Sequence, residues 1–131
     1  MSGKAIHGQK GDVINGSIKT ARNPSESRAV HNDQLARSAG FKGGLIMNEY
    51  HYTQLSEMLL EYFGLGWLMH GEIDVKYIAP LFDGNTFVPK AKVLGEDPRG
   101  SGRLSLEIWC ENQDGNKLAF GTASCLVEGK R

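Results

Sequence analysis

The sequence predicts an α+β domain in which one long helix is followed by an antiparallel sheet. Residues 45–63 contain neither glycine nor proline, and their apolar side chains recur at roughly helical spacing. Gly64 and Gly66 end this segment, as glycines commonly do beyond a helix. After them the hydrophobic period changes to two residues, which is typical of half-buried strands. We therefore expect one central helix, about four strands after it and a fifth strand before it.

Length and composition favour a single soluble domain that spans residues 1–131. The 15 basic and 15 acidic residues cancel, so no overall charge attracts nucleic acid or an anionic membrane. No apolar run is long enough to span a bilayer, and the N-terminus lacks the apolar core of a signal peptide, which predicts a cytoplasmic protein. Cys110 and Cys125 fall in expected strands and suit small buried residues better than a disulfide or a zinc site.

Two elements are expected before the long helix. Residues 13–21 alternate well enough for an edge strand, which Asn23 and Pro24 end because proline restricts the residue before it and lacks a donor. A short helix follows through residue 39, with Asn32 or Asp33 as its N-cap and Gly40 at its far end.

Four strands are expected after the long helix. Pro89 falls inside the second of them, which indicates a bulge or an edge position there. The last strand carries small residues on one side, and these let a helix lie close against it. The strands cover residues 67–79, 86–94, 103–111 and 117–128, with a hairpin at 112–116. A single helix wrapped by a curved antiparallel sheet of about five strands is the hot-dog fold.

The polar loop before the long helix carries the side chains best suited to catalysis. Glu26 lies five residues before His31, and Asp33 lies two residues after it. A carboxylate beside an imidazole raises its basicity, and the pair can hold a water and move a proton near neutral pH. Gly43 and Gly44 lead into the helix, whose first N–H groups can stabilise a developing oxyanion. The structural alternatives are that His31 braces the short helix, that Asp33 is an N-cap, and that the glycines serve close packing.

Other polar and aromatic residues give weaker indications. Glu49, His51 and Tyr52 near the helix start provide too few ligands for a metal site, and we expect most of them on the solvated or subunit-facing side. His70 is expected at the surface of a strand. Trp67 and Trp109 suit the core or an interface better than a ligand platform.

The order of several short motifs resembles the MaoC-like hydratases and dehydratases, the (R)-specific enoyl-CoA hydratase branch of the hot-dog superfamily. These motifs are His31-Asn-Asp33, Ala36, Gly40-Phe41 and Gly43-Gly-Leu-Ile46. The stretch 77–86, with its proline and Gly-Asn-Thr turn, is also similar to that family, as is the Asn-Gln-Asp-Gly stretch at 112–115. The resemblance extends from about residue 24 to the C-terminus and implies the same fold.

Position by position, the resemblance implies a catalytic pair. His31 matches the family's catalytic histidine. Glu26 stands where the family has a catalytic aspartate, and its side chain is one methylene longer than that of aspartate. Asn48 stands at the family's glycine whose backbone N–H polarises the thioester carbonyl, and Met47 replaces the histidine before it. The substrate-binding residues implied in this way are Phe41, Gly44, Met47, Asn48 and Tyr50.

The implied function is addition or removal of water across a 2-enoyl thioester of coenzyme A or of acyl carrier protein, without a cofactor or metal. An exposed strand edge predicts a homodimer or higher homo-oligomer. Two alternatives remain. A hot-dog thioesterase would use Glu49, whereas an inactive acyl-thioester-binding protein is what the changes at Glu26, Met47 and Asn48 predict.

Overall fold

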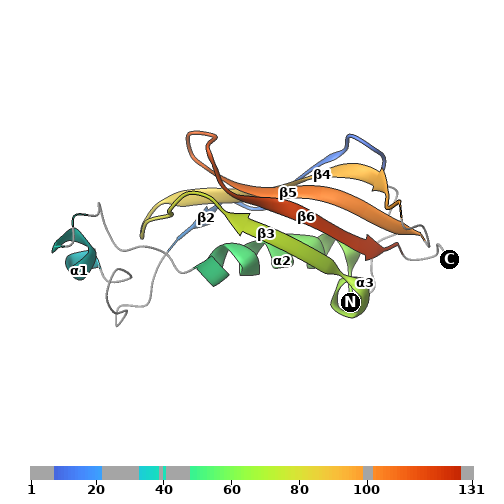
Figure 1. Cartoon of the computed structure of the whole chain (residues 1–131), viewed down its shortest axis with the longest axis horizontal. Helices are drawn as coiled ribbons and strands as arrows, with labels where there is room; N and C mark the ends of the chain where they lie inside the picture. Colours follow the sequence, from blue (N-terminus) through green and yellow to red (C-terminus); the bar gives the residue numbers. More distant parts are fainter. Residues whose placement is uncertain (1–7, 22–32, 39, 41–47, 99–101, 128–131) are drawn as a thin grey trace.

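The chain folds into one antiparallel sheet with its longest helix against one face (Figure 1). The computed structural model describes residues 8–21, 33–38, 40, 48–98 and 102–127. Its elements, in order, are β1 (Val13–Asn15), β2 (Lys19–Thr20), α1 (Asp33–Ser38), α2 (Asn48–Phe63), α3 (Gly66–His70), β3 (Glu72–Tyr77), β4 (Thr86–Glu96), β5 (Arg103–Asn112) and β6 (Lys117–Leu126).

The order of strands across the sheet is β1-β4-β5-β6-β3, and β2 also pairs with β4. Strands β4, β5 and β6 form a meander, while β3, the first strand after the helices, lies at one edge. All pairs are antiparallel. The sheet and its central helix form the hot-dog arrangement that the sequence predicts.

The central helix α2 packs its apolar stripe on the sheet. Leu55, Met58, Leu59 and Phe63 recur at helical spacing, and each is at most 5% exposed. The helix ends where predicted, because Gly64 adopts a φ of 74° and donates its N–H to the Leu60 carbonyl at 2.8 Å. The sequence predicts that this helix begins at residue 45, and residues 45–47 lie outside the described residues.

Small residues on β6 allow close approach of the neighbouring strand β3. Ala119 and Ala123 are buried on the side that faces the core. At Gly121 a Cβ would lie 1.8 Å from the Asp74 carbonyl oxygen of β3. Because no side chain fits there, β3 can pair with β6 in this register only if residue 121 is glycine.

The expected strand at 67–79 is wrong in its first part. Trp67 to His70 form the short helix α3, and the strand begins at Glu72. The Trp67 ring stacks on Phe63 at 6.0 Å between centroids, which buries it against the end of α2. Met69 is 77% exposed, so the alternation read from the sequence does not hold there.

The expected strand at 13–21 is split into β1 and β2 at the point where Pro89 lies opposite. Asn15 pairs with Lys90 and Lys19 pairs with Phe87, which leaves an extra residue on the N-terminal side. Gly16 donates its N–H to the Pro89 carbonyl at 2.8 Å. The irregularity predicted at Pro89 is confirmed, because the missing N–H of this proline faces the interruption.

Candidate functional site

Most of the predicted site residues cannot be placed. Glu26, His31, Phe41, Gly44 and Met47 lie outside the described residues. Two others belong to the first turn of α2, where the backbone is described: Asn48 is the first residue of the helix and Tyr50 is the third. The described part of the predicted site is therefore the start of the central helix.

The start of α2 offers hydrogen-bond donors. The first N–H groups of an α-helix have no acceptor within the helix, and the helix dipole makes this end positive. With 16 residues α2 is long enough for this effect, and it begins at Asn48. A carbonyl oxygen that gains negative charge is stabilised by such donors when water is excluded.

His51 is a buried residue near the start of α2. The sequence interpretation expected most of Glu49, His51 and Tyr52 on the solvated or subunit-facing side; Tyr52 is 43% exposed, but His51 is only 1% exposed. The His51 ring lies 5.7 Å from that of Tyr77 at the end of β3 and 5.8 Å from that of Phe87 on β4. The spacing to Leu55, four residues on, is the signal that places His51 on the buried stripe.

The position of His51 has a chemical consequence. It lies three residues after Asn48, so both residues fall on the same side of the helix. The His51 imidazole is held away from bulk solvent. The start of α2 therefore combines backbone N–H groups that have no acceptor within the helix with a buried imidazole.

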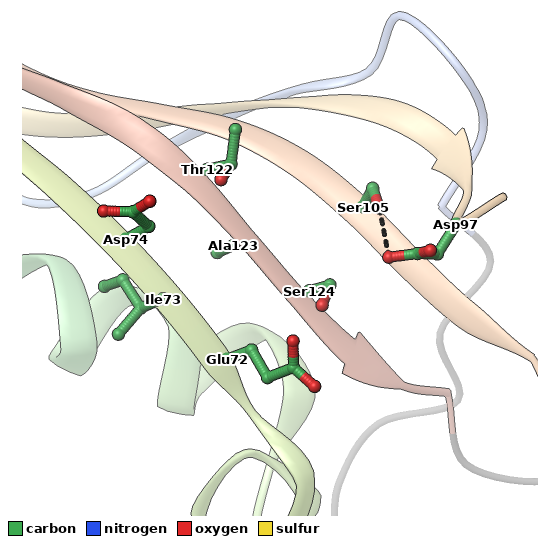
Figure 2. Close-up of a pocket in the computed structure, with 8 residues that line it drawn as sticks. All are labelled: Glu72, Ile73, Asp74, Asp97, Ser105, Thr122, Ala123 and Ser124. Carbon is green, nitrogen blue, oxygen red and sulfur yellow. Dashed lines mark hydrogen bonds between the residues drawn. The ribbon is translucent and has the colours of Figure 1, made fainter. Parts of the chain in front are cut away.

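The outer face of the sheet, opposite α2, carries a groove of about 290 Å³ (Figure 2). Carboxylates and hydroxyls dominate its lining, and Ser105 donates its hydroxyl to Asp97 at 3.1 Å. Asp97 is only 8% exposed. The residues that line the groove are Glu72, Ile73, Asp74, Asp97, Ser105, Thr122, Ala123 and Ser124. The sequence interpretation missed this groove, since its residues come from four separate segments.

Arg103 contacts residues of three elements beside one end of the groove. Its guanidinium donates to the His70 carbonyl at 2.8 Å and to the Ser124 hydroxyl at 3.0 Å. It also lies 3.4 Å from the Glu72 carboxylate. One side chain thus joins the end of α3 to β3 and β6.

The two thiols are unsuited to nucleophilic catalysis. Burial raises the pKa of Cys110 to about 12. Burial also raises the pKa of Cys125, whose Sγ lies 3.4 Å from the Gly66 carbonyl. The thiolate is the reactive form, and neither residue populates it near neutral pH. Within the described part of the chain, no three His, Cys, Asp or Glu residues are grouped so as to hold a metal ion.

Solved structures with the same fold include proteins described as a hydratase and a dehydratase. The R-hydratase PhaJ1 from Pseudomonas aeruginosa has a TM-score of 0.75 at 15% identity over 91% of this chain and 81% of its own. A MaoC-like dehydratase from Rhodospirillum rubrum has a TM-score of 0.68 at 16% identity over 94% of both chains. A Staphylococcus aureus protein solved in complex with CoA has a TM-score of 0.59 at 14% identity, over 88% of this chain and 80% of its own.

These likenesses confirm the predicted fold. The chain has the hot-dog fold found in R-hydratases and MaoC-like dehydratases. No protein-family model and no curated protein sequence matches it. None of the helices in the described residues has the length and apolar character that crossing a membrane requires.

Proposed function

We propose that this protein is a hydratase or dehydratase that adds water to, or removes it from, a 2-enoyl thioester. The observation that supports this most directly is the start of α2. The resemblance aligns Asn48 with the residue whose backbone N–H polarises the thioester carbonyl, and α2 begins at Asn48. An R-hydratase and a MaoC-like dehydratase share the surrounding fold over more than 90% of this chain.

In the proposed reaction Glu26 and His31 bind one water between them. His31 accepts a proton from this water as its oxygen attacks the β-carbon of the enoyl group. Negative charge passes to the thioester oxygen, which the N–H at Asn48 stabilises as an enolate. A proton then returns from the catalytic pair to the α-carbon, so that H and OH are added to the same face. Dehydration follows the same steps in reverse.

The acyl chain is proposed to lie beside α2, with Met47, Gly44, Phe41 and Tyr50 around the thioester. The carrier is coenzyme A or acyl carrier protein, and the reaction needs no cofactor. A CoA-bound protein of the same fold supports coenzyme A. The buried His51 is a polar side chain one turn inside the start of the helix, beside the rings of Tyr77 and Phe87.

We further propose that the protein forms a homodimer through the free edge of β3. In the described sheet this strand pairs only with β6, so its other edge is available for hydrogen bonding. Apolar side chains are exposed beside it on α3 and after the strand: Leu68 at 67%, Met69 at 77% and Ile78 at 50%. A second copy would cover both the edge and these side chains.

Two alternatives use the same fold. A thioesterase would use Glu49, in the first turn of α2, to attack or activate water at the thioester carbonyl. An inactive acyl-thioester-binding protein is favoured by the departures from the family pattern at Glu26, Met47 and Asn48, since a side chain at 48 can crowd the acyl group where glycine cannot.

The test is hydration of crotonyl-CoA, followed by loss of the enoyl absorbance, beside an assay of thiol release. We expect hydration by the natural protein and a loss of at least about 100-fold in His31→Ala and in Glu26→Gln, as for removal of a general base. His70→Ala is the matched control, because His70 is exposed at the end of α3 and its substitution should leave the rate unchanged.

The other outcomes discriminate between the alternatives. Thiol release that is lost in Glu49→Gln and retained in His31→Ala would identify a thioesterase. No turnover in either assay, with acyl-CoA still bound, would identify a binding protein, and Asn48→Gly would then be the variant to assay for restored hydration.

A further inference from the structure

A row of lysine and aromatic side chains crosses the outer face of the sheet. Strand register places Lys76 of β3 opposite Phe120 of β6. Phe120 in turn lies opposite Trp109 of β5, and Trp109 lies opposite Lys90 of β4. Lys117, at the start of β6, holds its Nζ 5.1 Å from the centroid of the Trp109 ring. We refer to these five residues as the lysine–aromatic row.

The lysine–aromatic row exposes apolar surface away from the edges of the sheet. Phe120 is 39% exposed, although β6 is flanked by β5 and β3. Ile108 and Cys110, on either side of Trp109, are buried on the inner face, so the Trp109 side chain lies on the outer face. An exposed aromatic residue bordered by charges is the composition of a protein contact surface.

Positive charge exceeds negative charge within the row. Glu111 is the carboxylate that pairs with it, 3.2 Å from the Lys90 Nζ, and this carboxylate also accepts a hydrogen bond from the Trp109 indole at 2.8 Å. Within the part of the chain that the structure describes, Lys76 and Lys117 form no ion pair. A partner that covers the row must therefore bring negative charge to the lysines and an apolar group to the aromatic rings.

The sign of the charge changes along the strands, which restricts the direction of a bound segment. The next row of the outer face carries two carboxylates, those of Asp74 and Glu107, beside one lysine, Lys92. An acidic segment that ran along the strands would meet these carboxylates. A segment that crosses the strands stays within the lysine–aromatic row.

The width of the row matches the repeat of an extended peptide. Lys76 and Lys90 are three strands apart, about 14 Å at the usual spacing between neighbouring strands. In an extended segment, residues i and i+4 point to the same side and lie about 13 Å apart, with residue i+2 midway between them. Acidic residues at i and i+4 would then reach the lysines at the two ends, and an apolar residue at i+2 would lie over the aromatic rings.

We propose that the lysine–aromatic row binds an extended segment of an acidic protein partner, which crosses the strands and has the pattern acidic–x–apolar–x–acidic. Two observations favour a protein over a nucleic acid. The Lys117 ammonium lies over the Trp109 ring on which a base would stack. The positive charge is confined to one row, whereas a nucleic-acid strand presents phosphates along its whole length. This surface lies on the face opposite α2 and does not depend on the proposed hydratase activity.

The test is fluorescence anisotropy of a labelled peptide, Gly-Ser-Glu-Thr-Leu-Thr-Glu-Ser-Gly, titrated with the full chain at low and high salt. The control peptide, Gly-Ser-Glu-Glu-Leu-Thr-Thr-Ser-Gly, has the same composition and charge but lacks the spacing. We expect the first peptide to bind at least about fivefold more tightly than the control. Its binding should weaken as salt rises, because the charges it joins remain partly solvated. A single-stranded oligonucleotide of thymidines is the probe for nucleic acid.

Variants of the row locate the binding. Lys76→Glu should weaken binding of the first peptide at least about tenfold, because it places like charges together at one end of the row. Binding should return for one of the two peptides in which a single glutamate is replaced by lysine. Phe120→Thr removes the exposed ring and should weaken binding about fivefold. Lys10→Glu, at an exposed position before β1, is the control with the same change of charge as Lys76→Glu.

Several results would overturn the proposal. One is absence of binding of the first peptide at about 1 mM protein, and another is equal binding of the two peptides. The others are equal effects of Lys76→Glu and Lys10→Glu, full binding by Phe120→Thr, and tighter binding of the oligonucleotide than of the peptide through the same residues.

Discussion

The two faces of the sheet are built from the same strands but have different roles. On β5 the residues Leu104, Leu106, Ile108 and Cys110 point to the inner face, and none is more than 7% exposed. The residues between them, from Ser105 to Trp109, form part of the polar outer face. A shift of one residue in register would exchange the two sets. The inner face therefore determines stability and register, which leaves the outer face free for contacts.

The largest effect is expected at Gly121, where the backbones of β3 and β6 approach each other closely. Gly121→Val would place side-chain atoms against the Asp74 carbonyl, 1.8 Å from the position of the new Cβ. Because β3 would have to move away from β6, we expect the free energy of unfolding to fall by more than about 4 kcal/mol, or folding to fail.

Urea unfolding followed by circular dichroism measures this change. Thr122→Ala, at the next position of β6 and on the outer face, is the control and should cost less than about 1 kcal/mol. Equal losses in the two variants would contradict the argument from close approach.

A smaller difference is expected between neighbouring residues of β5. Leu106 is fully buried and pairs with Ala123, whereas Glu107 lies on the outer face. Leu106→Ala should lower the free energy of unfolding by about 3 kcal/mol, through lost burial and the cavity it leaves. Glu107→Ala should change it by about 0.5 kcal/mol or less. The same urea titration applies, and a loss at Glu107 as large as that at Leu106 would show that the outer face carries core packing.

The sequence predicts the sheet well because alternation and turn residues act locally. The alternation of Leu104 to Cys110 and the small residues of β6 follow from side-chain period alone, and the structure confirms both. The helix α3 was missed because Trp67 and Met69 also fit a period of two, and stacking of Trp67 on Phe63 outweighs that pattern. A tertiary contact of this kind leaves no signal in a single short window.

The candidate sites depend on such long-range contacts. The burial of His51 was predictable from its helical spacing to Leu55. Its contacts with Tyr77 and Phe87 were not predictable, because these residues come from β3 and β4. The groove was not predictable, because Glu72, Asp97 and Ser124 are brought together only by the order of strands. The predicted pair Glu26 and His31 lies outside the described residues and stays a prediction.

The inner face should also protect its thiols. Burial raises the pKa of Cys110 to about 12, so at pH 8 only about one molecule in ten thousand carries the thiolate. We expect Ellman's reagent to react with neither cysteine of the native protein on the time scale of minutes, and with both after unfolding in urea. Rapid reaction of the native protein would show that the inner face opens far more readily than its packing indicates.

The smallest effect concerns a carboxylate on the outer face. The hydrogen bond from the Trp109 indole N–H, at 2.8 Å, lowers the pKa of Glu111, and Lys90 and Lys117 act in the same direction. A carboxylate with a lowered pKa stabilises the folded state above its unfolded pKa, and this contribution is lost as the pH falls through the folded value. Glu111→Gln should therefore be less stable than the natural protein at pH 6, by less than about 1 kcal/mol because the site is partly solvated. The two proteins should become equal in stability as the pH falls toward 3, measured by urea unfolding at each pH. A difference that does not change with pH would mean that Glu111 acts through packing, and that the charges of the outer face contribute nothing to the stability of the single chain.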